Sequence, residues 1–178
     1  FGLSNLMLMS QYPAMSAAQR TAAEGANLVN FLRGQRGFEN FESGVATTLY
    51  RVRPHVLGDV VGGQPVYVKA PLNGYVDTGY QAFKAAQAAR TPMVYVAAND
   101  GMLHGFDAET GAELMAFVPN AVYPELTYLT DESFNANHRL INDGTPRALD
   151  AYIGGGWKTI LVGTLGGGGK GVYALNVS

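Results

Sequence analysis

The glycine run near the C-terminus is considered first, because glycine-rich loops that end in lysine can bind phosphate groups. Residues 166–170 read GGGGK, but Thr164 occupies the position where a phosphate loop needs its first glycine, and Gly171 replaces the required Ser or Thr. The letters G-x-G-x-x-G over 166–171 match the dinucleotide pattern, yet the apolar residues that follow predict a strand rather than the helix that would hold a pyrophosphate. We therefore predict a flexible hairpin turn and no nucleotide cofactor.

The dispersed aspartates are the next candidates, because carboxylates are the usual ligands of calcium. A calcium loop brings about six oxygen atoms together over a short span, as in D-x-D-x-D-G, and the sequence has no such run. Glycine directly follows Asp100 and Asp143, and the sequence Glu-Thr-Gly follows shortly after Asp107. These patterns favour turns that aspartate side chains stabilise. We predict no metal ligand here, and read as structural turn residues Asp100, Gly101, Asp107, Gly111, Asp143 and Gly144.

The three histidines, His55, His104 and His138, are too widely spaced to match a known ligand set. His104 falls on a predicted strand, where it would pack or face solvent. No G-x-S-x-G elbow occurs, so we predict no catalytic residue and no enzyme activity. His138 and Arg139 lie next to each other in a long irregular segment, and they are the only candidate binding residues.

Two further groups have structural interpretations. Alternation places Arg51 and Arg53 on one face of a predicted strand, as a solvated face or as partners of Asp59. The single tryptophan, Trp157, follows three glycines and precedes a strand, which is typical of core packing at the edge of a sheet.

The composition excludes several classes of protein. Among 178 residues, 47% are hydrophobic and 15% are charged, which rules out general disorder. The formal net charge of −2 argues against a nucleic-acid partner of the usual basic kind. The absence of cysteine excludes a disulfide scaffold, a cysteine zinc site and a thiol nucleophile.

The ends of the chain suggest that it is part of a longer protein. Residues 1–9 (FGLSNLMLM) are apolar but shorter than the roughly 20 residues of a membrane span, and they lack the basic region of a signal peptide. The last residues read as a strand without a following turn. We therefore expect no transmembrane segment here and expect the targeting signal to lie elsewhere.

One helix is predicted near the N-terminus, over residues 16–34. Ser16 and Gln19 have the spacing of a capping box, and Gly34 stands where a left-handed C-terminal cap is expected. Leu28, Phe31 and Leu32 form an apolar stripe with helical spacing.

From residue 45 onward the pattern is that of β-strands, at 45–52, 66–69 and 93–97. The clearest unit, residues 92–114, holds two strands joined at Asn-Asp-Gly, a second turn at Glu-Thr-Gly, and the start of a third strand at 112–118, which predicts an antiparallel meander. Residues 159–177 form a weaker copy, and 66–68 open a third, degenerate one. Residues 120–150 interrupt the repeat, with a short helix or turn at 123–129.

Repeated meanders of this kind indicate a β-propeller, whose blades bury their faces against one another. We predict a mainly β fold in which one helical lead-in, residues 1–44, precedes the first part of a propeller, residues 45–178. About three blades of chain remain after the lead-in, too few to close a ring.

Seven segments occur in a characteristic order and cover most of the chain after residue 16. They are 28–37 (LVNFLRGQRG), 50–68 (YRVRPHVLGDVVGGQPVYV), 91–107 (TPMVYVAANDGMLHGFD), 117–122 (FVPNAV), 138–139 (HR), 142–144 (NDG) and 157–175. Together these segments resemble the C-terminal propeller of the type IV pilus biogenesis and tip-adhesin proteins, the PilC/PilY family. The resemblance implies that the partial propeller is quinoprotein-like.

The resemblance implies a non-catalytic module of an exported protein at the outer membrane, the cell surface and the pilus tip. Such a module would promote pilus extension, adhesion and twitching motility, with minor pilins, other pilus machinery and a host or abiotic surface as partners. Members of the family bind calcium through a clustered-aspartate loop in the propeller. No such loop matches here, so the resemblance places any calcium site outside this segment.

The unit at 94–114 also resembles the blades of pyrroloquinoline-quinone (PQQ) dehydrogenases, which gives an alternative enzymatic function. Those enzymes stack the quinone on tryptophan, hold calcium beside it, and often use a vicinal disulfide. This chain has one tryptophan and no cysteine, and a shared architecture does not transfer function. A generic outer-membrane scaffold is a third possibility.

Overall fold

The capping residues near the N-terminus begin a helix that is shorter than the sequence predicts. The computed structural model describes residues 3–178, so the first two residues of the apolar segment 1–9 lie outside it. The capping box is confirmed, with Ser16 Oγ accepting from the Gln19 amide at 3.2 Å and Gln19 Oε1 accepting from the Ser16 amide at 2.8 Å. However, the predicted single helix is two, α1 (Ala17–Ala22) and α2 (Ala26–Leu32), because Gly25 takes a φ of +63° and breaks the chain direction.

The predicted strand at 45–52 is also wrong, because a buried glutamine folds this segment into turns. The Gln19 side-chain amide, which is fully buried, donates to the carbonyl oxygens of Glu42, Val45 and Thr48 at 3.2, 2.8 and 3.3 Å. These bonds curl the backbone around one side chain. Only an isolated parallel bridge between Glu39 and Tyr50 resembles strand pairing there.

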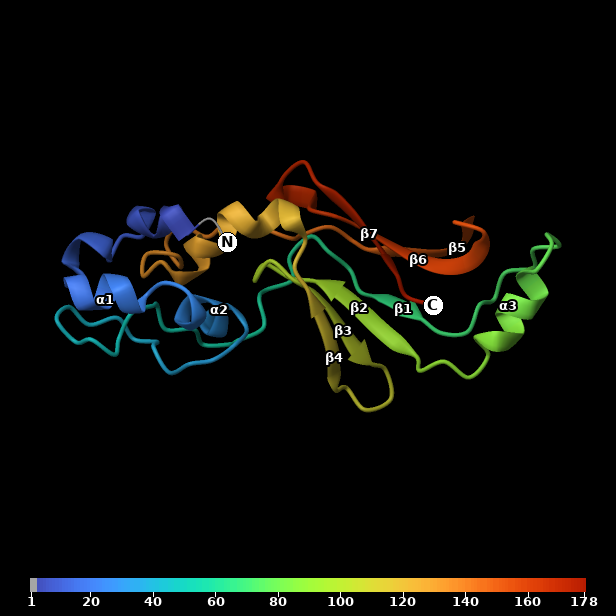
Figure 1. The fold of residues 1–178 in the computed structure, drawn as a ribbon, viewed down its shortest axis with the longest axis horizontal. Helices are drawn as coiled ribbons and strands as arrows, with labels where there is room; N and C mark the ends of the chain where they lie inside the picture. The colour runs from blue at the N-terminus through green and yellow to red at the C-terminus, as the bar shows by residue number, and fades with distance from the viewer. Residues whose placement is uncertain (1–2) are drawn as a thin grey trace.

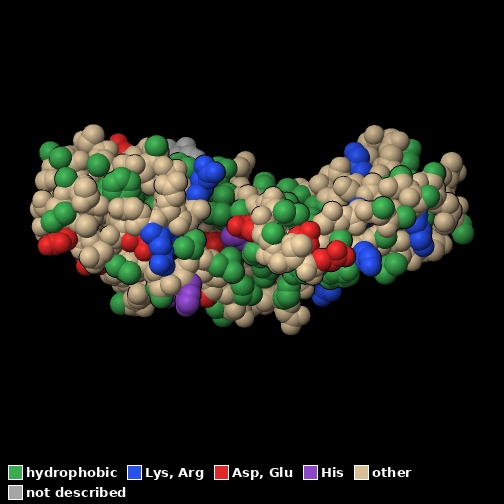
Figure 2. Space-filling model, turned by 90° about the horizontal axis from the view of Figure 1, so that it is seen from below, with side chains coloured by type: hydrophobic (Ala, Val, Ile, Leu, Met, Phe, Trp, Pro, Cys, Tyr) green, Lys and Arg blue, Asp and Glu red, His purple; other side chains and the backbone are tan. Residues whose placement is uncertain are grey.

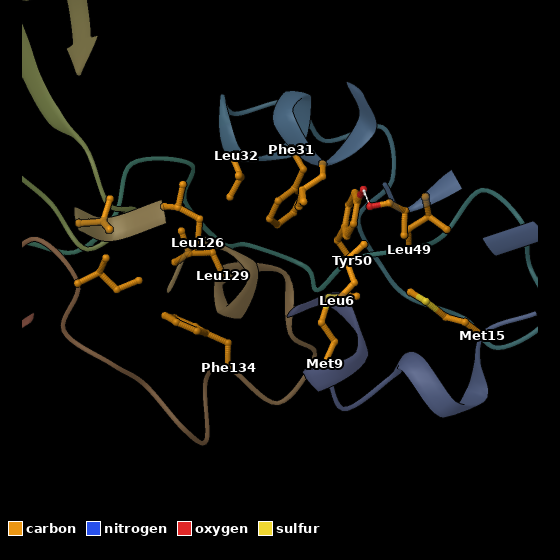
Figure 3. Close-up of a cluster of buried hydrophobic side chains, with 14 of the residues drawn as sticks. Leu6, Met9, Met15, Phe31, Leu32, Leu49, Tyr50, Leu126, Leu129 and Phe134 are labelled. Atoms are coloured by element: carbon orange, nitrogen blue, oxygen red, sulfur yellow. Dashed lines mark hydrogen bonds between the residues drawn. The ribbon is translucent and has the colours of Figure 1, made fainter. Parts of the chain in front are cut away.

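Residues 3–53 and 120–141, called here the N-terminal lobe, have their own apolar core, shown in Figure 3. Phe31 and Tyr50 pack with ring centroids 4.7 Å apart, and the Tyr50 hydroxyl donates to the Ala23 carbonyl at 2.9 Å. The 3-10 helices η1 (Leu3–Leu8) and η2 (Tyr12–Ala14) precede α1. A third, η3 (Asn120–Thr130), returns from between the two sheets and completes this core with Val122, Leu126 and Leu129. Its position agrees with the short helix or turn predicted at 123–129.

The first sheet contains the predicted meander and one more strand. Its order is β1 (Val66–Val68), β2 (Met93–Ala97), β3 (Leu103–Asp107) and β4 (Glu113–Phe117), all antiparallel. The segment predicted to open a third copy is therefore the outer strand of this sheet. The connection from β1 to β2 carries the helix α3 (Tyr80–Ala86), which the sequence did not predict.

The second sheet holds the predicted C-terminal copy. Strands β6 (Gly156–Thr164) and β7 (Val172–Asn176) pair antiparallel, and the glycine run between them forms the short 3-10 helix η4 (Gly166–Gly168). Strand β5 (Arg147–Ile153) pairs with β6 through a glycine turn, although the sequence placed its first residues in the interruption.

The two sheets pack through a shared apolar core that includes Tyr95, Leu103 and Leu161. The described residues thus form one four-stranded and one three-stranded blade rather than the three expected. This is a mainly β, partial propeller, as predicted. Figure 1 shows the lobe at one end, the sheets in the middle and α3 at the other end. Within residues 3–178, no helix is both long and apolar enough to cross a bilayer.

Replacing Gly144 with alanine is expected to lower the free energy of unfolding by about 2–3 kcal/mol. The added Cβ would lie well under 3.0 Å from the carbonyl oxygen and the hydroxyl of Thr164, so backbone has to move. Gly74→Ala is the matched control, because nothing lies within 4 Å of its Cβ position, and its effect should stay within about 0.5 kcal/mol. Urea unfolding of both variants measures the difference, and equal stabilities would contradict the close contact.

Candidate functional site

The loop of residues 57–63, called here the junction loop, runs past the Asn-Asp-Gly turn of the first sheet and the Asn-Asp-Gly segment before β5. The turn predicted at Asp143 and Gly144 is wrong, because this segment is irregular and Gly144 does not take a positive φ. The Gly58 amide donates to Asp100 Oδ2 at 2.8 Å, and the Gly62 amide donates to Asp143 Oδ1 at 2.7 Å. Asp100 lies in the turn between β2 and β3, and Asp143 lies just before β5. The two carboxylates therefore hold one loop against both sheets.

The glycines of the junction loop are needed for this close approach. A Cβ at Gly58 would meet the backbone of Asn99 and Asp100, and a Cβ at Gly62 would lie 2.5 Å from Asp143 Oδ2. Any side chain at either position would push the loop away from the turn and lengthen the hydrogen bond. The pattern LGDVVGG thus has a steric cause that only the folded structure shows.

Asn99 connects three segments through one side chain. Its Nδ2 donates to Asp59 Oδ2 at 3.1 Å, and its Oδ1 accepts from the Ile141 amide at 2.9 Å. Its own backbone amide donates to the Asp59 carbonyl at 3.0 Å. Because Asn99 is only 1% exposed, loss of any of these bonds would leave a buried polar group unpaired.

The two candidate binding residues point to different places. His138 Nε2 lies 3.0 Å from Asp59 Oδ1, and its ring packs edge-on against Phe134 at 5.4 Å. Arg139 instead lies 3.4 Å from a Glu125 carboxylate oxygen, and its guanidinium covers the Tyr128 ring of η3 at 3.7 Å. The structure brings His138 to the junction loop and leaves Arg139 on the lobe. Their role in binding stays a prediction.

Asp59 is held in its charged form by these neighbours. Burial by itself raises the pKa of Asp59, but the hydrogen bonds from His138 and Asn99 outweigh it and the net pKa lies below the ordinary value. Figure 2 shows histidine side chains, in purple, where the N-terminal lobe meets the middle of the molecule. His138 and Asn99 thus join the junction loop to the lobe and to the first sheet through the Asp59 carboxylate.

His104 is buried between two carboxylates, which the sequence did not indicate. It is 5% exposed, with Nδ1 2.6 Å from Glu113 Oε1 and Nε2 3.0 Å from Asp100 Oδ2. Burial alone lowers the pKa of His104, but the hydrogen bonds and charges of Asp100 and Glu113 outweigh it, and the net pKa is raised. Both ring nitrogens can donate only in the protonated form, so the two carboxylates favour the cation. The predicted meander was the available signal, because it places β4 beside β3.

The predicted arginine face is not solvated, because Arg53 is buried and Arg51 is half-buried. Arg53 is 6% exposed and forms an ion pair with Glu39, with Nη2 and Oε1 2.7 Å apart. Arg51 donates from Nε to the Leu129 carbonyl at 2.6 Å. Burial, followed by the charge of Arg53, lowers the pKa of Arg51 to about 10. Neither arginine side chain forms an ion pair with Asp59, so both interpretations offered by the sequence are wrong.

A cavity of about 190 Å³ lies between the lobe and the first sheet. Its walls include Phe31, Arg53, Asp59, Asn99, Phe134 and His138. The charged groups among them, Arg53, Asp59 and His138, already have partners in the protein, so the cavity lies at a contact between packed segments of the chain. Across the part of the chain that the structure describes, no three His, Asp or Glu side chains are grouped to hold a metal ion.

Comparisons with known proteins agree with this architecture. Residues 57–178, which begin at the first residue of the junction loop, match a family described as the PilY1 beta-propeller domain. The chain is 46% identical over 166 residues to a type IV pilus biogenesis factor PilY1 homolog of Xylella fastidiosa, covering 88% of this chain and 13% of that protein. It is 42% identical over 163 residues to PilY1 of Pseudomonas aeruginosa strain PAK, covering 87% and 13%.

A solved structure is also similar. The crystal structure of the P. aeruginosa PilY1 C-terminal domain is 46% identical, covers 55% of this chain and 18% of that chain, and has a TM-score of 0.43. The chain spans about 13% of the length of the curated relatives it matches.

The Asn99→Asp variant is expected to lose about 2 kcal/mol of stability, because it removes the donor to Asp59 and places a second carboxylate beside it. The exposed Asn135, on the same cavity wall, supplies the control Asn135→Asp, with an effect within about 0.5 kcal/mol. Denaturant unfolding compares them. Equal losses of stability in both variants would show that Asn99 does not hold the junction loop in place.

The stability of the chain should depend on the protonation of His104. Because its folded pKa is raised, its contribution is fully present below the unfolded pKa of about 6.5 and is lost as pH rises through the folded pKa. We expect the free energy of unfolding to fall over that range in the unmodified chain and to fall less in His104→Gln. The exposed His55 gives the control His55→Gln, which should keep the full pH dependence. Identical pH profiles for all three proteins would contradict this assignment.

Proposed function

The chain belongs to the PilY1 β-propeller family, and from this premise we propose that it is a non-catalytic module of type IV pilus assembly. It would promote pilus extension against retraction and carry an adhesive surface that supports twitching motility. The match of residues 57–178, from the junction loop to the end of the second sheet, is the observation that carries this proposal. Its relatives are named type IV pilus biogenesis factors.

The geometry of the junction supports a mechanical rather than a chemical role. A module that opposes retraction must keep its shape under load, and the junction loop is bonded to a carboxylate of each sheet. The titratable groups beside it, His104 between two carboxylates and His138 on Asp59, are used to join segments. A rigid body of this kind presents loops to a partner without changing its own covalent structure.

The position of the tryptophan gives no support to the quinoprotein alternative. Trp157 lies at the start of β6 with its ring against Tyr75, at a centroid distance of 5.6 Å and an interplanar angle of 21°. One side of the indole is thus occupied by a protein ring. A quinone stacked on that side would first have to displace Tyr75.

The partners and the location follow from the same proposal. Minor pilins and other pilus machinery would bind the module, and a host or abiotic surface would be the target of adhesion. The protein would be exported to the outer membrane and cell surface, at the pilus tip. Any calcium site of the family would lie outside the residues described here.

The decisive experiment is genetic. Residues 16–178 are deleted in frame from the encoding gene, and surface pili and twitching are measured with pilus retraction intact and with it disabled. If the module opposes retraction, pili should disappear in the first background and return in the second. Normal pili and twitching in both backgrounds would refute the proposal.

Point variants refine this test. Asn99→Asp in the full gene should reduce surface pili in the retracting strain, because it loosens the junction, whereas Asn135→Asp should leave them unchanged. Immunoblots of surface fractions must show that both variants are exported at the same level.

A further inference from the structure

An aromatic cluster surrounds the only tryptophan, far from the junction. Trp157 contacts Tyr75, Tyr80 and Tyr152, with ring centroids 5.6, 4.8 and 5.8 Å away. Tyr75 comes from the loop before α3, Tyr80 from α3 itself, and Tyr152 from β5. Figure 1 shows α3 beside the β5–β6 hairpin, at the end of the molecule opposite the N-terminal lobe.

The inner part of this cluster is locked by hydrogen bonds. Trp157 Nε1 donates to the Thr78 carbonyl at 3.0 Å, and the hydroxyl of the fully buried Tyr80 donates to Asp150 Oδ2 at 2.7 Å. Asp150 Oδ1 in turn accepts from the Thr159 hydroxyl at 2.7 Å. Trp157 and Tyr80 are therefore oriented before any ligand arrives, which lowers the entropic cost of binding.

The outer part of the cluster is open. A hollow of about 480 Å³ is lined by Tyr75, Asp77, Thr78, Asp150, Tyr152 and Trp157. Tyr152 is 60% exposed and Tyr75 is 38% exposed. Within the described residues, the Asp77 carboxylate and the hydroxyls of Thr78, Tyr75 and Tyr152 form no hydrogen bond. The hollow thus combines fixed aromatic faces with unused polar groups at its rim.

We infer that this aromatic hollow binds a neutral saccharide. A sugar ring has an apolar face of C–H bonds. Their partly positive hydrogens are attracted to the negative face of an aromatic ring. Its hydroxyls point outward, where the Asp77 carboxylate and the tyrosine and threonine hydroxyls can pair with them. Asp77 is unpaired and Asp150 lies at the wall, so their charge disfavours an acidic or sulfated sugar.

A proline-rich peptide fits the same groups less well. Such peptides offer carbonyl acceptors and few N–H donors, so their receptors need free donors such as a tryptophan N–H. Here Trp157 Nε1 already donates to Thr78. The free carboxylate of Asp77 favours a ligand that is rich in hydrogen-bond donors. A polyhydroxylated sugar ring is such a ligand.

A quaternary ammonium ion is also a poorer fit. Aromatic cages bind such cations strongly only when the rings exclude water, and at exposed sites the interaction is weak. Tyr152 and Tyr75 are open to solvent, and the hollow is much larger than one methylated ammonium group. The cation would remain hydrated there.

The single tryptophan makes the test direct, because the intrinsic indole fluorescence of the chain comes from Trp157 alone. The 178-residue chain is titrated with cellotetraose and with chitotriose. We expect a saturable fluorescence change with at least one of them, at a dissociation constant of about 1 mM. Tyr152→Ala and Asp77→Asn should each weaken binding about tenfold. Tyr67→Ala, a tyrosine 57% exposed outside the hollow, should not weaken it.

Several results would overturn the inference. They are no saturable change with either oligosaccharide, equal weakening by Tyr67→Ala, or saturation by choline chloride or decaproline in place of the sugars. Circular dichroism shows whether each variant is folded, and both hollow variants alter exposed side chains. The site goes beyond the pilus role, so a failure here leaves the pilus proposal standing, and a failed pilus phenotype leaves the titration valid.

Discussion

The structure depends on two carboxylates that accept hydrogen bonds from the backbone of one glycine-rich loop. Both aspartates lie in an Asn-Asp-Gly sequence, Asp100 in the turn between β2 and β3 and Asp143 in the irregular segment before β5. Each accepts a hydrogen bond from a backbone amide of residues 57–63. A partly buried carboxylate needs such donors, since leaving it unpaired costs more than most other single changes. The loop can supply its amides only because glycine allows its backbone to approach the turns. This loop therefore adds polar contacts at both sheets to the apolar core that the sheets share.

The lobe is not a separate body attached to the propeller. Its core combines η1, α1 and α2 with η3 and the residues around Phe134, which leave the first sheet and return before the second. The buried Arg53–Glu39 pair adds a polar element to this core, and Arg53 also donates to the Phe31 carbonyl at 2.8 Å. A buried ion pair adds little net stability, but removing one partner is costly. The pair therefore specifies how the chain after α2 is positioned rather than strengthening the fold.

The junction loop and the aromatic hollow differ in how their polar groups are paired. At the junction, charged groups are used to join segments, with His104 between two carboxylates and His138 on Asp59. In the hollow, by contrast, Asp77 and two tyrosine hydroxyls face solvent beside rings that are already fixed. The bonded junction loop lies between the lobe and the sheets, and the open hollow lies beside α3 at the end of the molecule opposite the lobe (Figure 1). The junction loop and the hollow can be tested by different measurements because they share no residue.

The sequence alone determined the features that depend on neighbouring residues. The capping box at Ser16, the Asn-Asp-Gly turn of the first sheet and the strands β2, β3, β4, β6 and β7 follow from local spacing and alternation, and the ordered motifs placed the chain in its family. Other features were decided by the tertiary structure: the strand partner of residues 66–68, the turns around Gln19, the ion pair of Arg53 and the cluster around Trp157. The reason is distance along the chain. Gly58 and Asp100 are 42 positions apart, and Gly62 and Asp143 are 81 apart, so neither bond leaves a pattern that a local window can contain.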